Sequence, residues 1–393
     1  MKIMNPRLKI CIVTSNRADF GLLNNLINEI NRYKKNFDLK IIVTGSHLFK
    51  SHGLTINEII KNRQIKIFKK IEIYSTALHD ANFISDALSK TIVKFQNIFK
   101  KYSNDIVVLL GDRYEILGVA LAATINRIAI AHIHGGELTE GAIDDQIRHA
   151  ITKFSHLHFV SAEEYKKRVI QLGEQPDTVH NVGALGLDSV INTKFFSKKE
   201  IEKILCIKFQ KYFLIVTLHP ETQKKGLTKN LIFQLLEALN QLKNTTIIFT
   251  MPGADLEYKI IKSEINKFIK KKNNAFFFKS LGQKLYLSCL KYSNGMIGNS
   301  SSGIFEMPYF GRGTINIGDR QKGRILMNSV INVNPVKQEI LNAIKLIISK
   351  EFMLNKKSKK NIYGNGLAAK KIVNILKRID LKNIRQKVFY NIN

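Results

Sequence analysis

The stretch Asp105–Arg113, with the sequence DIVVLLGDR, decides the fold class of this 393-residue chain. Its apolar residues are consecutive, without the alternation of a strand that has one face in water. Such a run is typical of a strand buried on both faces of a parallel sheet, so we expect a strand over Asp105–Leu110. Gly111 ends the run, and Asp112 and Arg113 follow at its carboxyl end.

The same pattern recurs along the chain, with helical periodicity between the apolar runs. Further strands are expected at Lys9–Val13, Leu39–Val43, Ile128–Ile133, His156–Val160, Phe213–Thr217, Thr246–Thr250, Ala275–Phe278, Gly295–Ile297 and Thr314–Ile317. This alternation predicts an α/β protein with two Rossmann-like doubly wound domains and a cleft between them. We expect the domains to span residues 1–185 and 186–365, with a helical tail over 366–393.

Composition limits the classes of function. The net charge is +31, from 62 Lys and Arg against 31 Asp and Glu, but the lysines are scattered in sequence. A nucleic-acid-binding protein would explain the charge and would bind any duplex in a salt-sensitive way. It would not explain acids and histidines at strand ends, so we expect no nucleic-acid partner and interpret the charge mainly as a solvated surface that also steers anions.

The three cysteines, Cys11, Cys206 and Cys289, are far apart and fit neither a disulfide framework nor a zinc site. A reducing cytoplasm is the simplest location for such a chain. Neither a signal peptide nor an apolar stretch of about 20 residues is visible, so no membrane association is expected.

Polar residues gather where the predicted strands end, which is where parallel α/β sheets bind ligands. Asp112 fits either a general base or a helix cap. His132 and His134 permit a metal site, but acid–base chemistry fits better because no zinc-like ligand spacing accompanies them. Asp144 fits either a helix cap, with Asp145 in the first turn, or a carboxylate that reaches the cleft. His219 follows another strand, where it is structural or catalytic.

The turn Gly298–Gly303, with the sequence GNSSSG, lies between a strand and a probable helix. Its amides and hydroxyls suit a phosphate, with Glu306 one turn further on and able to bind a ribose. A plain helix cap of small residues is the other interpretation.

Together, nine segments resemble the hydrolysing UDP-N-acetylglucosamine 2-epimerases, and most closely the bacterial branch that supplies N-acetylmannosamine for sialic acid capsules. These segments are TSNRADFGLL (14–23), VTGSHL (43–48), GDRYEILGVALAA (111–123), HIHGGE (132–137), DDQIRHAITKFSHLHF (144–159), EEYKKRVIQLGE (163–174), LHPET (218–222), GNSSSG (298–303) and INIGDRQKGR (315–324).

The resemblance implies a fold of the glycosyltransferase-B type whose tail often crosses back to the first domain. It also implies a homodimer that needs neither a redox cofactor nor a metal. The implied reaction begins with anti elimination of UDP across C1 and C2 to give 2-acetamidoglucal. Water then adds with the opposite configuration at C2, which gives N-acetylmannosamine.

The resemblance also implies roles for individual residues. Asp112, Asp144, His134, Glu137 and His219 match or adjoin positions of the catalytic set, with His219 near the leaving phosphate. Substrate and UDP contacts are implied for Arg17, Arg113, Ser301, Ser302, Glu306 and Arg320. The chain departs from the usual HIEGGE at His134, where many members carry Glu in an acid–base role. A neutral imidazole suits that work at pH 7, and Glu137 is the other candidate.

Two enzymatic alternatives remain at this level. The first is the same reaction on the 2,4-diacetamido-6-deoxy analogue that is used for legionaminic acid. The second is an inverting glycosyltransferase of the same fold, which would not release free sugar without an acceptor.

Overall fold

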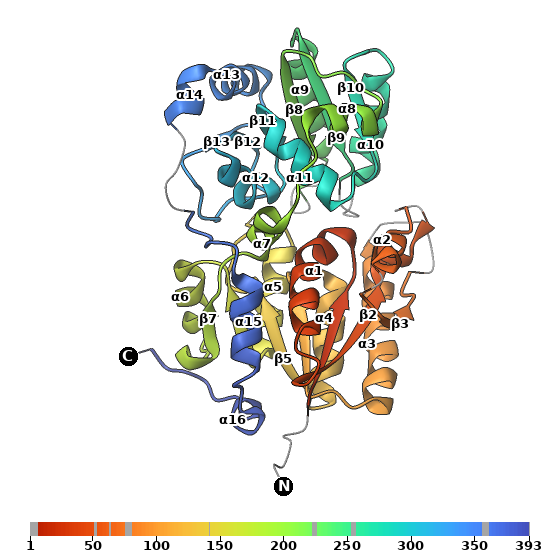
Figure 1. Cartoon of the computed structure of the whole chain (residues 1–393), viewed down its shortest axis with the longest axis vertical. Coiled ribbons are helices and arrows are strands. Elements are labelled where there is room, and N and C mark those ends of the chain that lie inside the picture. The colour runs from red at the N-terminus through yellow and green to blue at the C-terminus, as the bar shows by residue number, and fades with distance from the viewer. Residues whose placement is uncertain are drawn as a thin grey trace. The chain divides into compact units, whose positions relative to one another are not determined.

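The computed structural model describes residues 7–50, 53–62, 64–74, 81–140, 142–221, 226–252, 257–355 and 361–392. Contacts divide the chain into two compact units. The first comprises Met1–Glu137, Asp144–Ser189 and Tyr363–Asn393, and the second comprises Leu138–Ile143 and Val190–Ile362. Each unit is a parallel β-sheet with helices on both faces (Figure 1), which confirms the α/β class predicted from the consecutive apolar runs.

The strands of the first unit are β1 (Leu8–Thr14), β2 (Phe37–Thr44), β3 (Ile67–Ile71), β4 (Ile106–Leu110), β5 (Ala129–Ile133), β6 (Leu157–Val160) and β7 (Val179–Asn181). Its helices are α1 (Arg17–Asn31), α2 (Ile56–Lys61), α3 (Ala81–Lys101), α4 (Tyr114–Ile125), α5 (Asp144–Phe154), α6 (Glu163–Gln171), α15 (Ala368–Leu376) and α16 (Leu381–Arg385). Helix α7 (Leu185–Asn192) contains the boundary between the units.

The strands of the second unit are β8 (Tyr212–Thr217), β9 (Thr245–Thr250), β10 (Ala275–Phe278), β11 (Gly295–Gly298), β12 (Gly313–Ile317) and β13 (Val330–Val333). Its helices are α8 (Lys198–Leu205), α9 (Thr228–Asn240), α10 (Tyr258–Ile269), α11 (Gln283–Tyr292), α12 (Ser302–Phe305), α13 (Lys337–Ile347) and α14 (Lys350–Asn355).

Burial on both sheet faces explains the consecutive apolar runs. In β1, Ile10 and Ile12 pack into the cluster that includes residues of α1 and α15, whereas Cys11 and Val13 pack with residues of α3 and α4. Side chains alternate between faces along a strand, so a strand covered on both sides needs an apolar residue at every position. The second sheet follows the same rule, with separate clusters on its two faces.

Strand order determines where ligands meet each sheet. The first sheet runs β3-β2-β1-β4-β5-β6-β7, and the second runs β10-β9-β8-β11-β12-β13. The order reverses between β1 and β4 in the first sheet and between β8 and β11 in the second. Such switch points, at the carboxyl ends of the strands, are the ligand sites of open α/β sheets. Asp112 follows β4 and His219 follows β8, so both candidates lie at a switch point.

Candidate active site

Asp112 forms an ion pair with a deeply buried arginine in the first unit. Its carboxylate accepts from the guanidinium of Arg148 on α5, whose side chain is 1% exposed, while that of Asp112 is 24% exposed. The helix-cap interpretation of Asp112 is wrong, because Arg113 is the N-cap of α4 and makes no side-chain capping bond. The ion pair favours the carboxylate form, which is the form that a general base requires.

Arg148 also reaches the loop after β5. Its Nη1 donates to the carbonyl oxygen of Glu137 at 2.8 Å and lies 3.5 Å from Oδ1 of Asp145. A buried guanidinium is stable only when several acceptors satisfy it. Arg148 therefore joins the segments after β4 and β5 to the first turn of α5.

His134 and Glu137 lie together in this loop. His134 Nδ1 is 2.8 Å from Glu137 Oε1, which also accepts from Oγ of Ser161 at 2.8 Å. Gly136 makes the turn possible, because its φ is +75° and a Cβ there would stand 2.5 Å from the carbonyl oxygen of Tyr165. The loop thus presents a histidine and a carboxylate in direct contact at the carboxyl end of β5.

The neighbouring His132 has a structural role. Its Nε2 lies 2.7 Å from the carbonyl oxygen of Gly111 and its Nδ1 lies 3.1 Å from Oγ1 of Thr152. Burial lowers the pKa of His132 to about 3, so the ring is neutral at pH 7. The carbonyl can only accept, so Nε2 carries the proton. His132 therefore supports the residue before Asp112.

Asp144 and Asp145 begin α5 and form its acidic first turn. Asp144 is half-buried, and Asp145 lies between Arg148 and His149, with 3.6 Å from its Oδ2 to His149 Nε2. Negative charge at a helix N-terminus is stabilised by the helix dipole. The structure thus places Asp144 within the helix start, one turn from the arginine that pairs with Asp112.

The two candidate arginines of the first unit pair with separate carboxylates. Arg17, the first residue of α1, lies 3.4 Å from Glu58, and Arg113 lies 3.5 Å from the buried Glu115. Burial raises the pKa of Glu115. Arg17 and Arg113 follow β1 and β4, which are paired strands, so both belong to the switch point of the first sheet.

In the second unit, the fully buried Asn299 organises the carboxyl ends of β8 and β11. Its amide oxygen accepts from the backbone N–H of His219 at 2.7 Å, and its amide nitrogen donates to the carbonyl of His219 at 2.9 Å. Its own carbonyl accepts from Arg320 at 3.3 Å and Gln321 at 2.7 Å. One residue thereby fixes His219 and Arg320, two of the predicted site residues.

Ser301 and Ser302 are half-buried at the start of α12, which follows β11 directly. Ser301 is the N-cap residue and makes no side-chain capping bond, whereas Oγ of Ser300 accepts from the N–H of Ser302 at 3.4 Å. The phosphate site and the plain helix cap therefore both stay predictions for this turn. Gly298 lets the chain pass β8, since its φ is +131° and a Cβ would stand 1.9 Å from the carbonyl oxygen of Thr217. Glu306 is 8% exposed at the end of α12.

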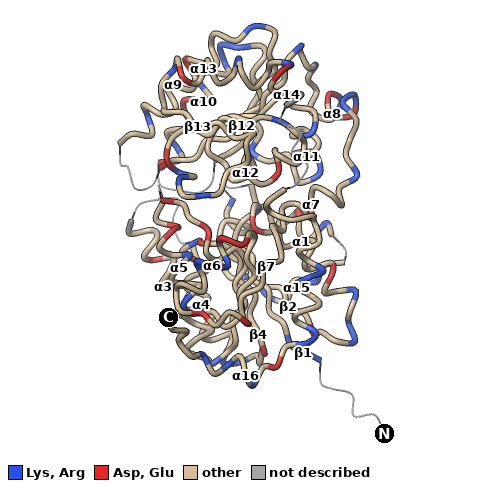
Figure 2. The backbone as a smooth tube through the Cα atoms, turned by 90° about the vertical axis from the view of Figure 1, so that its left-hand side faces the viewer, with Lys and Arg blue, Asp and Glu red and all other residues tan. Residues whose placement is uncertain are grey.

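Three further features of the structure bear on function: possible metal ligands, possible membrane spans and the distribution of charge. In the described part of the chain, no three His, Cys, Asp or Glu side chains form a group that could hold a metal ion. No helix in the same ranges is long and apolar enough to cross a membrane. Figure 2 shows Lys and Arg spread over elements of both units and interspersed with Asp and Glu.

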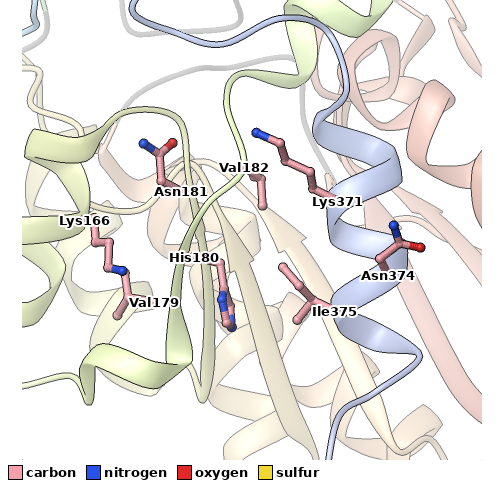
Figure 3. Close-up of a pocket in the computed structure, with 8 residues that line it drawn as sticks. All are labelled: Lys166, Val179, His180, Asn181, Val182, Lys371, Asn374 and Ile375. Atoms are coloured by element: carbon pink, nitrogen blue, oxygen red, sulfur yellow. The ribbon is translucent and has the colours of Figure 1, made fainter.

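A pocket of about 440 Å³ lies elsewhere in the first unit, among α6, β7 and α15 (Figure 3). Its lining is Lys166, Val179, His180, Asn181, Val182, Lys371, Asn374 and Ile375. Lys166 and Lys371 extend from opposite walls without converging on one point. The lining includes none of the predicted site residues.

Three residues that complete these groups were not among the predicted site residues: Arg148, Ser161 and Asn299. Arg148 could have been found from its position, because it lies about one helical turn after the Asp144-Asp145 pair. Asn299 stood inside the small-residue turn and was interpreted only as part of it. Ser161 follows β6 and carries no motif, so only strand adjacency shows its contact with Glu137.

Comparison with known proteins identifies the family. The sequence profile of the UDP-N-acetylglucosamine 2-epimerases matches residues 28–377. The chain is 43% identical to a GDP/UDP-N,N'-diacetylbacillosamine 2-epimerase (hydrolyzing) of Campylobacter jejuni, covering 98% of this chain and 99% of the relative. It is 39% identical to the polysialic acid biosynthesis protein P7 of Escherichia coli, covering 98% and 97%.

A solved structure shares the fold. The crystal structure of a UDP-GlcNAc 2-epimerase from Neisseria meningitidis bound to UDP-GlcNAc superposes with a TM-score of 0.79 at 18% identity, covering 94% of this chain and 99% of that one. The profile match and the two relatives cover nearly the whole chain. The protein therefore belongs to the UDP-N-acetylglucosamine 2-epimerase family.

Proposed function

We propose that the protein is a hydrolysing 2-epimerase that converts a UDP-linked 2-acetamido sugar into UDP and the free sugar epimerised at C2. The observation that carries the proposal is 43% identity, over 98% of the chain, to a relative named as a hydrolysing 2-epimerase. The buried network of Asp112, Arg148, Glu137 and His134 supports it, because the reaction needs positioned acid and base groups.

The reaction proceeds in two steps. A base takes the proton from C2 while the bond between C1 and the UDP oxygen breaks, which gives 2-acetamidoglucal and UDP. Water then supplies a hydroxyl to C1, and C2 receives a proton on the opposite face. The C2 proton is weakly acidic, so base and leaving-group stabilisation must act together.

We assign proton transfer to Asp112, His134 and Asp144, which lie at the strand ends and helix start of the first unit. Asp112 is paired with a cation and keeps a quarter of its side chain exposed, as a base toward substrate requires. His219 is assigned to the leaving phosphate. The binding residues are Arg17 and Arg113 for the diphosphate side, Ser301 and Ser302 for phosphate, Glu306 for the ribose, and Arg320.

Two sugars are candidates. UDP-N-acetylglucosamine, which would yield N-acetylmannosamine for sialic acid synthesis, is favoured by the 39% identity to a polysialic acid biosynthesis protein. UDP-2,4-diacetamido-2,4,6-trideoxyglucose is favoured by the 43% identity to the Campylobacter jejuni relative. Both reactions use the same C1 and C2 chemistry and differ only at C4 and C6.

The test is proton NMR of the purified protein with each substrate in D₂O with EDTA. We expect UDP and a free 2-epimerised sugar that carries deuterium at C2. The substrate that is turned over identifies the sugar. Folded protein that leaves both substrates intact would contradict the proposal. Transfer of the sugar only when an acceptor is supplied would instead indicate a glycosyltransferase.

A further inference from the structure

His134 and Glu137 are alternatives for a single acid–base role, and their environments differ. We infer that Glu137 is a positioning residue, whose carboxylate holds the imidazole of His134 with Nδ1 protonated and Nε2 as the basic nitrogen. Its effect on catalysis rests on the proposed function. The arrangement of the two side chains does not.

Glu137 is enclosed by the fold. Its side chain is 2% exposed, and one oxygen, Oε1, accepts from Ser161 and faces Nδ1 of His134, both at 2.8 Å. Its main-chain carbonyl accepts from the buried Arg148 at 2.8 Å. The side chain of His134 is also buried, at 9% exposed, and its Nε2 is enclosed as well, so Glu137 is only the more enclosed of the two. The contact between the two side chains, more than the difference in exposure, therefore assigns Glu137 to orienting its neighbour.

The hydrogen-bond inventory assigns the tautomer. An ionised carboxylate has no proton to donate, so the imidazole nitrogen that faces Oε1 must carry one. The hydroxyl of Ser161 donates to the same oxygen, and this independent hydrogen bond favours the ionised form of Glu137. In a neutral ring the proton on Nδ1 leaves Nε2 as the acceptor, and Nε2 is then the nitrogen able to take a proton.

The backbone holds His134 in an unusual conformation. Its φ is +68°, in the left-handed region that residues other than glycine rarely adopt, and its N–H donates to the carbonyl of Phe159 at 2.9 Å. Strained residues of this kind cluster at functional sites. The strain turns His134 out of the line of β5, whereas His132 stays within the strand and binds Gly111.

Charged and titratable groups of several segments lie around this pair. They include His132 on β5, Asp112 after β4, Arg148 and Asp145 on α5, and Arg168 on α6, which donates to the carbonyl of Gly136, with Ser161 after β6 as a neutral donor. Arg148 pairs with Asp112, and separately the carboxylate of Glu137 contacts the His134 ring directly.

The first test needs no substrate. The full-length protein, labelled with ¹⁵N in histidine, gives long-range ¹H–¹⁵N spectra that distinguish protonated from unprotonated ring nitrogens, and His134→Gln identifies the His134 signals. We expect Nδ1–H in the wild type and in Glu137→Gln, whose amide oxygen still accepts. Glu137→Leu should shift the ring toward Nε2–H. Finding Nε2–H in the wild type would overturn the inference.

The second test is kinetic, on whichever UDP-sugar the wild type turns over. Glu137→Leu should lower kcat about 100-fold with KM within about threefold, and Glu137→Gln should retain most of the lost activity. The double variant of His134→Gln and Glu137→Leu should be no slower than His134→Gln alone, because both changes disable one unit. Equal losses in Glu137→Gln and Glu137→Leu would instead make Glu137 the proton carrier.

Two further measurements separate the possible failures. If Glu137→Leu does not fold, Ser161→Ala removes one anchor of the carboxylate at smaller cost and should broaden the His134 signals while lowering kcat less than about tenfold. If the wild type turns over neither sugar, the proposed function fails, but the ring spectra still decide the tautomer.

Discussion

Different kinds of side chain hold the carboxyl ends of the two sheets: an ion pair in the first unit and a neutral amide in the second. In the first unit, the buried Arg148 pairs with the carboxylate of Asp112 after β4 and donates to the main-chain carbonyl of Glu137 in the loop after β5. In the second unit, the ends of β8 and β11 are held by the neutral Asn299, which bonds the main chain of His219. Moving protons needs ionisable groups held in a low-dielectric site, whereas binding a phosphate needs amides and hydroxyls.

Replacing the carboxylate at the end of β4 should give the largest effect. Asp112→Asn keeps the shape but removes the proposed base, so we expect kcat to fall more than about 1000-fold while the Kd for UDP stays within about threefold. Turnover and calorimetric UDP titration measure the two quantities. Activity near that of the wild type would remove Asp112 from the mechanism. It would also contradict the proposed division between proton transfer in the first unit and phosphate binding in the second.

Replacing the buried Arg148 tests, through the free energy of unfolding, whether charged contacts matter more in the first unit than in the second. Arg148→Met leaves Asp112 and the Glu137 carbonyl without their cation, and we expect a loss of about 3 kcal/mol in the free energy of unfolding. The matched control in the second unit is Arg320→Met, which removes a half-buried arginine and should cost less than about 1 kcal/mol. Urea unfolding measures both, and equal losses would contradict the comparison.

Acid should weaken the first unit before the second. Burial lowers the pKa of His132 to about 3 and that of His156 to about 4. Below pH 6.5 both histidines therefore bind a proton in the unfolded chain but stay neutral in the folded unit. Stability is therefore lost as pH falls from 6.5, by about 3 kcal/mol at pH 4.5 for the fully buried His132. In the second unit, burial raises the pKa values of Tyr258 and Cys289, which lie above neutral pH.

A second acid-sensitive contact lies in the first unit. Burial raises the pKa of Glu174, but hydrogen bonds from His158, Lys153 and Lys387 outweigh it and lower the pKa to about 2. The contribution of Glu174 to stability is therefore lost as pH falls from 4.5 toward 2. Hydrogen exchange resolved by peptide, from pH 7 to about pH 3, should show protection lost first in the first unit. Simultaneous loss in both units would contradict this prediction.

Removing a hydroxyl at the start of α12 should have the smallest effect. Ser301→Ala and Ser302→Ala each delete one hydroxyl that we assign to phosphate binding, and we expect the Kd for UDP to rise about fivefold with kcat within about twofold. Calorimetry with UDP and steady-state kinetics measure the two. A large fall in kcat with unchanged UDP affinity would assign these serines to the chemistry instead.

Central strands could be predicted from the sequence, and most edge strands could not. The expected strand Ala275–Phe278 coincides with β10, and the other expected strands differ from the observed ones by at most two residues at either end. The strands β3, β7 and β13 were not predicted. They lie at sheet edges, and β3 reads IFKKI with two exposed lysines, so a run buried on both faces is absent there.

The sequence by itself determined the two α/β halves, the family and the polar residues at the ends of the strands. These are local properties, because a strand buried on both faces must be apolar throughout and a tight turn must carry small or polar residues. Only the tertiary structure decided the partners. Asp112 meets Arg148 across 36 residues, Glu137 meets Ser161 across 24, and Leu138–Ile143 packs with the second unit while its neighbours pack with the first. Such pairs depend on strand order and register, which bring distant segments together without any local trace in the sequence.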